Sequence, residues 1–156
     1  MSDRFPVEKG SYALWLVLSE AAQIEVGRLG VVAFPRGDYI YSGSARGSGG
    51  LRGRLRHHLQ SSPRPHWHID YLRGVAMIRG VFYRVTEEPL ECHWSQMLAK
   101  APGAEIPRAG FGASDCRSGC AAHLVLFPAG LAQEEIISLL TIRGEDFPFY
   151  EVIHQP

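Results

Sequence analysis

The chain has 156 residues, with 16 basic and 16 acidic residues and a formal net charge of zero. This length predicts one domain, 1–156, whose core needs no disulfides. Three cysteines are an odd number, which argues against a disulfide framework, and no apolar run is long enough to cross a membrane. The first ten residues lack the pattern of a signal peptide, so we expect a cytoplasmic protein with no membrane partner.

Positive charge is concentrated in the middle of the chain. Between Ser44 and Arg84 there are eight arginines and one acidic residue, Asp70, a net charge of +7, so the remainder carries −7. Fourteen of the sixteen basic residues are arginine, whose guanidinium can bind phosphate through two hydrogen bonds. We interpret the segment either as a surface that faces a polyanion or as a solvated charged face without a partner.

The first third of the chain is rich in strand patterns. Residues 1–9 are expected to form a loose lead-in. Apolar and aromatic runs predict strands over Ser11–Ser19, Gln23–Gly27, Gly30–Phe34 and Asp38–Ala45, the second being the hairpin partner of the first. Leu51, Leu55 and Leu59 then recur every four residues, which predicts a helix over Gly49–Gln60.

The rest of the chain mixes helices and strands. The expected elements are a short helix within His66–Gly74, a strand over Val75–Thr86, a helix over Glu87–Lys100, a glycine-rich loop over Ala101–Gly119, a strand over Ala121–Phe127 and a helix over Gly130–Gly144. Residues 128–156 are expected to form a C-terminal helical extension. Because strands and helices mix without strict alternation, the expected fold class is α+β.

A glycine-rich turn joins an aromatic strand to the basic helix. Tyr41 ends the strand, and glycines such as Gly43 allow a tight turn that brings backbone N–H groups near a ligand. The next helix has an anion-attracting N-terminus, with Arg54 and His58 four residues apart on one face. This order predicts a tyrosine, a turn, an arginine and a histidine that converge on one phosphate. The alternative is a plain hairpin loop followed by an amphipathic basic helix.

Five residues in a fixed order carry a resemblance to a known family. The tripeptide GSY ends at Tyr12, YSG begins at Tyr41, Arg54 and His58 lie on the next helix, and Glu91 lies on a further helix. In this order they resemble the signatures of the GIY-YIG nuclease superfamily. The segments GSA…GG, HWHIDYL, EC and SDC…HL make the chain most similar to the small stand-alone Uri-type endonuclease branch, over roughly residues 9–127.

The resemblance implies a fold and a reaction. The fold is a small central, mostly antiparallel β-sheet flanked by helices, and the reaction is the hydrolysis of phosphodiester bonds in DNA. Glu91 would hold Mg²⁺ or Mn²⁺, since such hard cations accept one carboxylate together with phosphate oxygens and waters. Tyr12 or Tyr41 would orient or deprotonate the attacking water, while Arg54 would lower the tyrosine pKa and bind the developing charge.

Further residues are expected to contact the substrate. His58 would transfer a proton or contact phosphate, a role that His57 beside it can also take. The residues expected to bind substrate or phosphate are Gly43, Ser44, Arg46, His57, His68, Ser114 and Asp115. Many family members place an asparagine near the site, but this chain has none, so Ser114 or Asp115 would supply the oxygen. Ser44 stands where excision-repair incision subunits of the superfamily carry lysine, so one cationic contact to the phosphate is either missing or supplied by Arg46.

The cysteines suggest a second kind of site. Cys116-x₃-Cys120-x₂-His123 has the ligand types and the cysteine spacing of zinc sites, and a fourth ligand would come from Cys92 or His93. Because only three ligands are local, free thiols buried in a core are the favoured interpretation and zinc is the alternative.

The motif HWHID could also be taken for a metal site. Its histidines, His66 and His68, are two residues apart, a spacing that does not align side chains on a helix. We therefore expect a structural role or a position at the edge of the substrate, with Trp67 buried.

The leading functional hypothesis is a metal-dependent DNA endonuclease. The alternatives are a non-catalytic nucleic-acid-binding module with the same fold and a zinc-stabilised partner-binding domain built on DCRSGCAAH.

Overall fold

The computed structural model of the chain describes residues 4–60, 64–114, 116–142 and 148–153. These residues form a five-stranded antiparallel sheet, in the order β6-β4-β1-β5-β7, and a separate ribbon of β2 and β3. The strands are β1 (Gly10–Leu18), β2 (Ala22–Glu25), β3 (Val31–Phe34), β4 (Gly37–Ala45), β5 (Met77–Val85), β6 (Leu124–Phe127) and β7 (Phe149–Val152). The helices are α1 (Gly50–Leu59), α2 (His68–Arg73), α3 (Glu91–Ala99) and α4 (Gln133–Leu140), with a 3₁₀ turn, η2 (Gly27–Leu29), in the ribbon. Within the described ranges, no helix is long and apolar enough to cross a membrane.

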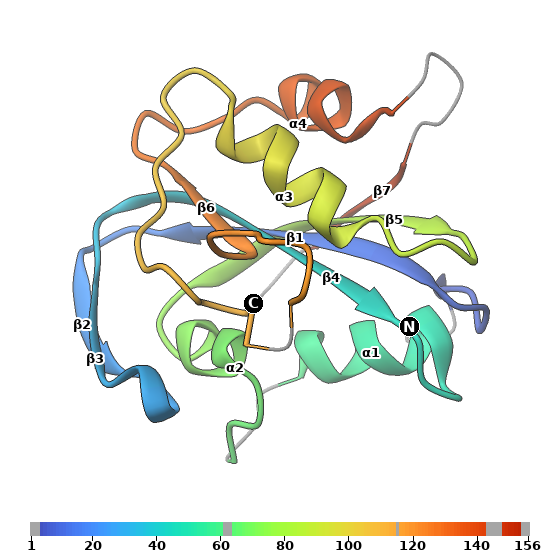
Figure 1. The fold of residues 1–156 in the computed structure, drawn as a ribbon, viewed down its shortest axis with the longest axis horizontal. Helices are drawn as coiled ribbons and strands as arrows, with labels where there is room; N and C mark the ends of the chain where they lie inside the picture. Colours follow the sequence, from blue (N-terminus) through green and yellow to red (C-terminus); the bar gives the residue numbers. More distant parts are fainter. Residues whose placement is uncertain (1–3, 61–63, 115, 143–147, 154–156) are drawn as a thin grey trace.

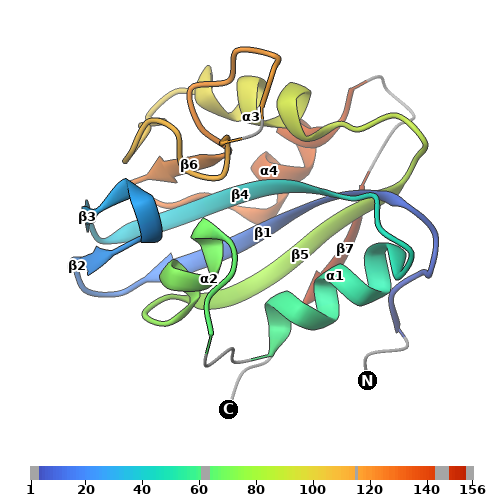
Figure 2. The same ribbon diagram turned by 60° about the horizontal axis from the view of Figure 1, so that its bottom comes forward.

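Helices cover both faces of the sheet. Side chains alternate along β1, so that Tyr12 and Leu14 pack in a core cluster with α1 and α2, while Ala13 and Trp15 pack in a second cluster with α3 and α4. Figure 1 shows α3 and α4 above the sheet and α1 and α2 below it. In Figure 2, α1 and α2 lie in front of the strands. The expected fold class, α+β with an antiparallel sheet flanked by helices, is confirmed.

The expected pairing of the first two strands is wrong. β1 lies between β4 and β5, whereas β2 pairs with β3, with Ala22 opposite Phe34. β1 is buried along nearly its whole length, as a central strand should be, and β2 alternates partly buried with exposed residues. Because one face of β2 is solvated, β2 does not take a central place in the five-stranded sheet and instead pairs with β3 in the separate two-stranded ribbon.

The end of the chain differs from the expected helical extension over 128–156. α4 is followed by β7, which adds to the free edge of β5 with Phe82 opposite Tyr150. Gly80 of β5 admits this strand, since a Cβ at Gly80 would lie 2.7 Å from the ring of Tyr150. Residues 143–147 and 154–156 of the expected extension lie outside the described residues.

The start of the chain differs from the expected loose lead-in. Residues 1–3 lie outside the described residues, but Phe5 is 1% exposed and belongs to the core. The carbonyls of Pro6 and Glu8 accept the N–H groups of Arg52 and Leu51 at 2.8 and 2.9 Å. No side chain caps α1, so these carbonyls satisfy backbone donors of its first turn and fix the helix against the sheet.

Candidate functional site

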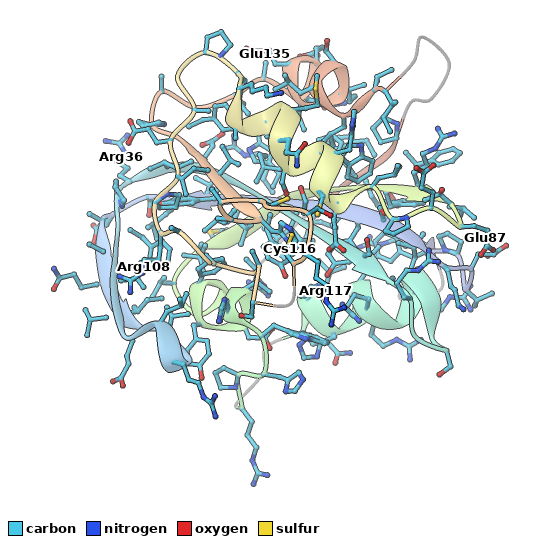
Figure 3. All side chains as sticks on the ribbon, viewed as in Figure 1. Arg36, Glu87, Arg108, Cys116, Arg117 and Glu135 are labelled. Atoms are coloured by element: carbon cyan, nitrogen blue, oxygen red, sulfur yellow. The ribbon has the colours of Figure 1, made fainter. Side chains whose placement is uncertain are left out.

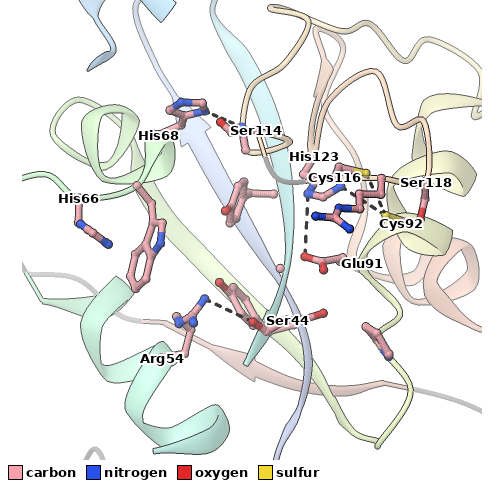
Figure 4. Close-up of a pocket in the computed structure, with 17 residues that line it drawn as sticks. Ser44, Arg54, His66, His68, Glu91, Cys92, Ser114, Cys116, Ser118 and His123 are labelled. Carbon is pink, nitrogen blue, oxygen red and sulfur yellow. Dashed lines mark hydrogen bonds and ion pairs between the residues drawn. The ribbon is translucent and has the colours of Figure 1, made fainter. Parts of the chain in front are cut away.

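A polar cavity of about 580 Å³ lies between α1, the segment before α2, the start of α3 and the loop that precedes β6. Eight residues expected to act in catalysis or binding line it: Tyr12, Tyr41, Gly43, Ser44, Arg54, His68, Glu91 and Ser114. Figure 3 shows Cys116 and Arg117 near the middle of the visible face, with Arg36 and Arg108 toward the β2–β3 ribbon. In Figure 4, Arg54 on α1 and Glu91 on α3 lie on opposite sides of the cavity.

Two tyrosines from neighbouring strands line the cavity. The rings of Tyr12 on β1 and Tyr41 on β4 have centroids 6.5 Å apart. Burial raises the pKa of Tyr12 to about 12, although the Arg54 guanidinium partly opposes this shift. Burial also raises the pKa of Tyr41 well above its usual value. Both phenols are therefore protonated at neutral pH.

His58 lies behind Tyr12 rather than in the cavity. Its side chain is 1% exposed, and its Nε2 is 2.7 Å from the Tyr12 hydroxyl. Burial lowers the pKa of His58 to about 3, so the imidazole is neutral. A neutral ring beside a protonated phenol shares one hydrogen with it, which either the Tyr12 hydroxyl or His58 Nε2 donates, depending on the tautomer of the ring. His58 therefore reaches the cavity through Tyr12 and not, as one expectation had it, by contact with phosphate.

Arg54 is held by two contacts. Its guanidinium carbon lies 4.4 Å from the centroid of the Trp67 ring, and its Nη1 donates to the backbone oxygen of Ser44 at 3.3 Å. A guanidinium stacked on an indole keeps its N–H donors in the plane of the group, where a phosphate can accept them.

Glu91 is the first residue of α3. Its side chain is 30% exposed, and the partial positive charge of the helix N-terminus favours its carboxylate. The N–H of Leu90, just before the helix, donates to the buried hydroxyl of Ser11 at 2.8 Å, which ties this end of α3 to β1. Glu91 is the single acidic side chain among the described residues that line the cavity, and its Oε2 lies 3.9 Å from Nδ1 of His123.

Two glycines make room for the tyrosines. A Cβ at Gly43 would collide with the hydroxyl end of Tyr12, and a Cβ at Gly112 would lie 2.8 Å from Cε1 of Tyr41. Gly112 also has a φ of +70°, a conformation that favours glycine. The glycine of YSG therefore admits the Tyr12 ring in addition to allowing a tight turn.

His57 pairs with Asp70 and does not line this cavity. The distance from His57 Nε2 to Asp70 Oδ1 is 3.0 Å, and Asp70 Oδ2 accepts the N–H groups of His66 and Trp67 at 2.8 and 2.9 Å. Burial opposes the charge on Asp70, but these N–H groups and His57 together lower its pKa. His57, His58 and Asp70 are close enough to hold a metal, yet His57 Nε2 and the Asp70 carboxylate bind each other, the carboxylate also binds the backbone, and His58 Nε2 is paired with Tyr12. The pair instead fixes the segment that carries Trp67.

His68 supports the loop on the far side of the cavity. Its Nδ1 accepts the N–H of Gly112 at 2.8 Å, and burial lowers its pKa. In HWHID, Asp70 and His68 thus have structural contacts, Trp67 is partly buried against Arg54, and His66 lies exposed at the rim. These contacts match the structural role expected for the motif.

One expected phosphate contact lies elsewhere, and one cannot be placed. Arg46 is exposed outside the cavity, where its Nη1 donates to the backbone oxygen of Thr86 at 3.2 Å. β4 and β5 both flank β1, so the residues that follow them, Arg46 and Thr86, come together at the end of the sheet. Asp115 lies outside the described residues.

The three cysteines gather beside Glu91. Cys92 Sγ lies 3.5 Å from Cys116 Sγ and 3.6 Å from His123 Nε2, and Cys120 Sγ completes a group whose ligand atoms all lie within 4.8 Å of one another. Burial opposes ionisation of Cys116, but the N–H groups of Cys120 and Ser118 lower its pKa to about 6. All three thiols are partly exposed, in contrast to the favoured interpretation of free thiols buried in a core. His93, the other fourth ligand considered, is exposed and outside the group.

From the sequence, no cavity role was expected for Ser11 or Arg117, and Trp67 was expected only as a buried residue. Ser11 anchors the start of α3, Trp67 stacks on Arg54, and Arg117 adds a second cationic side chain to the lining. Trp67 carried a usable signal, since an aromatic residue between histidines in a basic segment is a common platform for a cation. The role of Ser11 depends on a contact 79 residues away, which no local pattern reveals.

A search of curated proteins and a search of solved structures each found no match. A family model described as "Domain of unknown function DUF123" matches residues 11–143. This range spans all the described residues that line the cavity, from Tyr12 to His123. The match covers most of the chain, and the protein therefore belongs to the DUF123 family.

Proposed function

We propose that this protein is a divalent-metal-dependent endonuclease that hydrolyses phosphodiester bonds in DNA, a cytoplasmic member of the GIY-YIG nuclease superfamily close to its stand-alone Uri-type branch. One observation carries the proposal: Tyr12, Tyr41, Arg54 and Glu91 come from four different elements and line one cavity. The cavity combines a carboxylate, two phenols and a guanidinium, which are the groups that the resemblance implies for this reaction.

Glu91 suits a hard cation. It offers a partly exposed carboxylate at the cavity wall, whose Oε2 lies 3.9 Å from His123 Nδ1, and phosphate oxygens and waters can supply the remaining ligands of a cation. A bound Mg²⁺ or Mn²⁺ would stabilise negative charge on the scissile phosphate and the leaving oxygen.

Arg54 faces Glu91 across the cavity and would bind the phosphate. Its stacking on Trp67 and its bond to Ser44 fix the guanidinium before substrate arrives. A donor held in place in this way stabilises charge on phosphoryl oxygens without reorganising during the reaction.

Tyr12 would orient the attacking water. Its hydroxyl lies 2.7 Å from His58 Nε2, and this hydrogen bond holds the Tyr12 oxygen in place at the cavity wall. This fixed position favours Tyr12 over Tyr41 for the role. Since burial keeps both phenols protonated, proton removal from water depends on the cationic surroundings of the loaded site.

The test is a cleavage assay with the purified full chain on supercoiled, single-stranded and branched DNA, with Mg²⁺, with Mn²⁺ and with a chelator. We expect metal-dependent cleavage of at least one substrate. Glu91→Gln and Arg54→Ala should each lower the rate by about 100-fold or more, the usual effect of removing one charged group from a transition-state site. The matched control is Glu87→Gln, which changes an exposed glutamate four residues earlier and should cut like the parent.

The proposal fails if no substrate is cut, or if Glu91→Gln and Arg54→Ala both cut as fast as the parent. DNA binding without cleavage would also refute it and would favour the non-catalytic binding module. Binding is measured separately by fluorescence anisotropy, so the two results can be distinguished.

A further inference from the structure

The Cys–His cluster combines residues from three parts of the chain. Cys92 lies in the first turn of α3, Cys116 and Cys120 lie in the loop before β6, and His123 directly precedes that strand. These are all the cysteines in the sequence, so the fold brings every thiol of the chain to one place.

The spacing of the ligand atoms fits a tetrahedral metal. In a tetrahedral zinc site with Zn–S bonds of about 2.3 Å, neighbouring ligand atoms are about 3.8 Å apart. The distances of 3.5 Å from Cys92 Sγ to Cys116 Sγ and 3.6 Å to His123 Nε2 are close to that value. Three thiolates and an imidazole are soft ligands that select zinc over the hard cations suited to Glu91.

The surroundings of the thiols favour a metal over apolar packing. The three cysteines are partly exposed, Cys92 and Cys116 line the polar cavity, and none of the three belongs to either of the two described hydrophobic clusters. Gln96 Nε2 lies 3.8 Å from Cys120 Sγ, within range of a weak hydrogen bond to sulfur.

Glu91 lies next to the cluster on the far side of His123. The imidazole turns Nε2 toward Cys92 and Nδ1 toward Glu91 Oε2, at 3.6 and 3.9 Å. Metal-bound histidines commonly have a carboxylate near the second ring nitrogen, which orients the ring. Glu91 therefore lines the cavity beside the cluster, of which Cys92, Cys116 and His123 line it too.

We propose that Cys92, Cys116, Cys120 and His123 bind one structural Zn²⁺, which fixes the loop before β6 to the start of α3. Four protein ligands make a closed site, so this zinc supports the fold and leaves no open position for substrate. Cys92 directly follows Glu91, so the metal would also hold the backbone that carries the cavity's carboxylate. The zinc assignment rests on the cluster and is independent of the proposed nuclease activity.

Metal content of the purified full chain is the first test. We expect about one zinc per chain, which is retained on dialysis and released by a strong chelator together with a loss of thermal stability. Reconstitution with Co²⁺ should give the intense visible absorption and the sulfur-to-metal charge-transfer band of tetrahedral thiolate coordination. Fewer than about one zinc per ten chains, with no such cobalt spectrum, would overturn the proposal, as would a Cys92–Cys116 disulfide in the purified protein.

Variants identify the ligands. Cys116→Ser and His123→Ala should lower the zinc content at least fivefold, whereas His93→Ala, which changes an exposed neighbour of Cys92, should retain it. Loss of zinc in His93→Ala but not in His123→Ala would contradict the assigned ligand set. If a cysteine variant fails to fold, the metal content and cobalt spectrum of the parent still decide the question. None of these measurements uses DNA cleavage, so failure of the zinc proposal and failure of the nuclease proposal are distinct.

Discussion

His58 is a buried histidine that folding keeps neutral, which makes stability depend on pH. Burial lowers its pKa from 6.5 to about 3. Between these values the unfolded chain binds a proton that the folded chain does not, so stability should fall as pH decreases from about 6.5 toward 3. Asp70 does not contribute to this pH dependence well above pH 3.8, because its pKa is lowered from 3.8 in the folded chain and the carboxylate is ionised in both the folded and the unfolded state.

The parent should therefore lose up to about 1.4 kcal/mol of unfolding free energy per pH unit from this group between pH 6 and 4.5. His68, whose pKa is also lowered by burial, adds in the same direction, so the measurement is a comparison with His58→Gln. In urea denaturation, the free energy of unfolding of His58→Gln should fall less steeply than that of the parent between about pH 6 and 4.5. Above about pH 7.5 the free energies of the two proteins should change with pH in parallel. Equal slopes in acid would contradict the burial of a neutral His58.

The order of site residues along the chain could be predicted, but their individual contacts could not. Tyr12, Tyr41, Arg54 and Glu91 were expected from the resemblance, and they line one cavity. The position of His58 behind Tyr12 could not be predicted, since residues on one helix face can point to the core or to the cavity. Cys92 joins ligands 24 and more residues away, so spacing alone left its participation open.

At the scale of elements, α1 depends on a glycine at its start. Gly50 has a φ of +61°, and a Cβ there would collide with the backbone oxygen of Val7. Gly53, one turn later in the same helix, is exposed and has open space around its Cα. The two glycines of this basic helix therefore have opposite expected responses to the same substitution.

Gly50→Ala should lower the free energy of unfolding by about 2 kcal/mol or more, because it combines left-handed strain with a backbone collision. Gly53→Ala should raise it by about 0.5–1 kcal/mol, because alanine favours a helix interior. Chemical denaturation of both variants checks the pair. A Gly50→Ala protein as stable as the parent would contradict the described path of residues 7–50.

Local patterns predicted most elements but not how they pair. The four α-helices lie within the expected ranges, and every strand except β7 overlaps an expected one, although β1, β2 and β4 each begin one residue earlier. Hydrophobic periodicity predicts these elements because it follows from the burial of one face. Pairing is a long-range property, so the position of β2 beside β3 had no local signal. β7 was missed because a four-residue strand carries little periodicity, and its position depends on the free edge of β5.

Across the whole molecule, the charge of the segment from Ser44 to Arg84 is partly used inside the fold. Arg46, Arg52, Arg54 and Arg73 each donate to a backbone carbonyl, so the net charge of +7 does not translate directly into phosphate contacts. Arg117 lies outside that segment, yet it is exposed and lines the cavity together with Arg54. We therefore expect a polyanion to bind at the cavity and its rim, and not along the whole basic segment.

The salt dependence of DNA binding tests this narrower interpretation. Each phosphate neutralised on duplex DNA contributes about −0.9 to the slope of log affinity against log salt concentration. Arg117→Ala should therefore reduce the magnitude of the slope by about 0.9, measured by anisotropy without added Mg²⁺ or Mn²⁺ so that nothing is cut. Arg36→Ala removes the same charge from an exposed site outside the cavity and should leave the slope unchanged. Equal effects of the two substitutions would mean that DNA responds to overall charge, and would contradict a DNA-binding surface confined to the cavity and its rim.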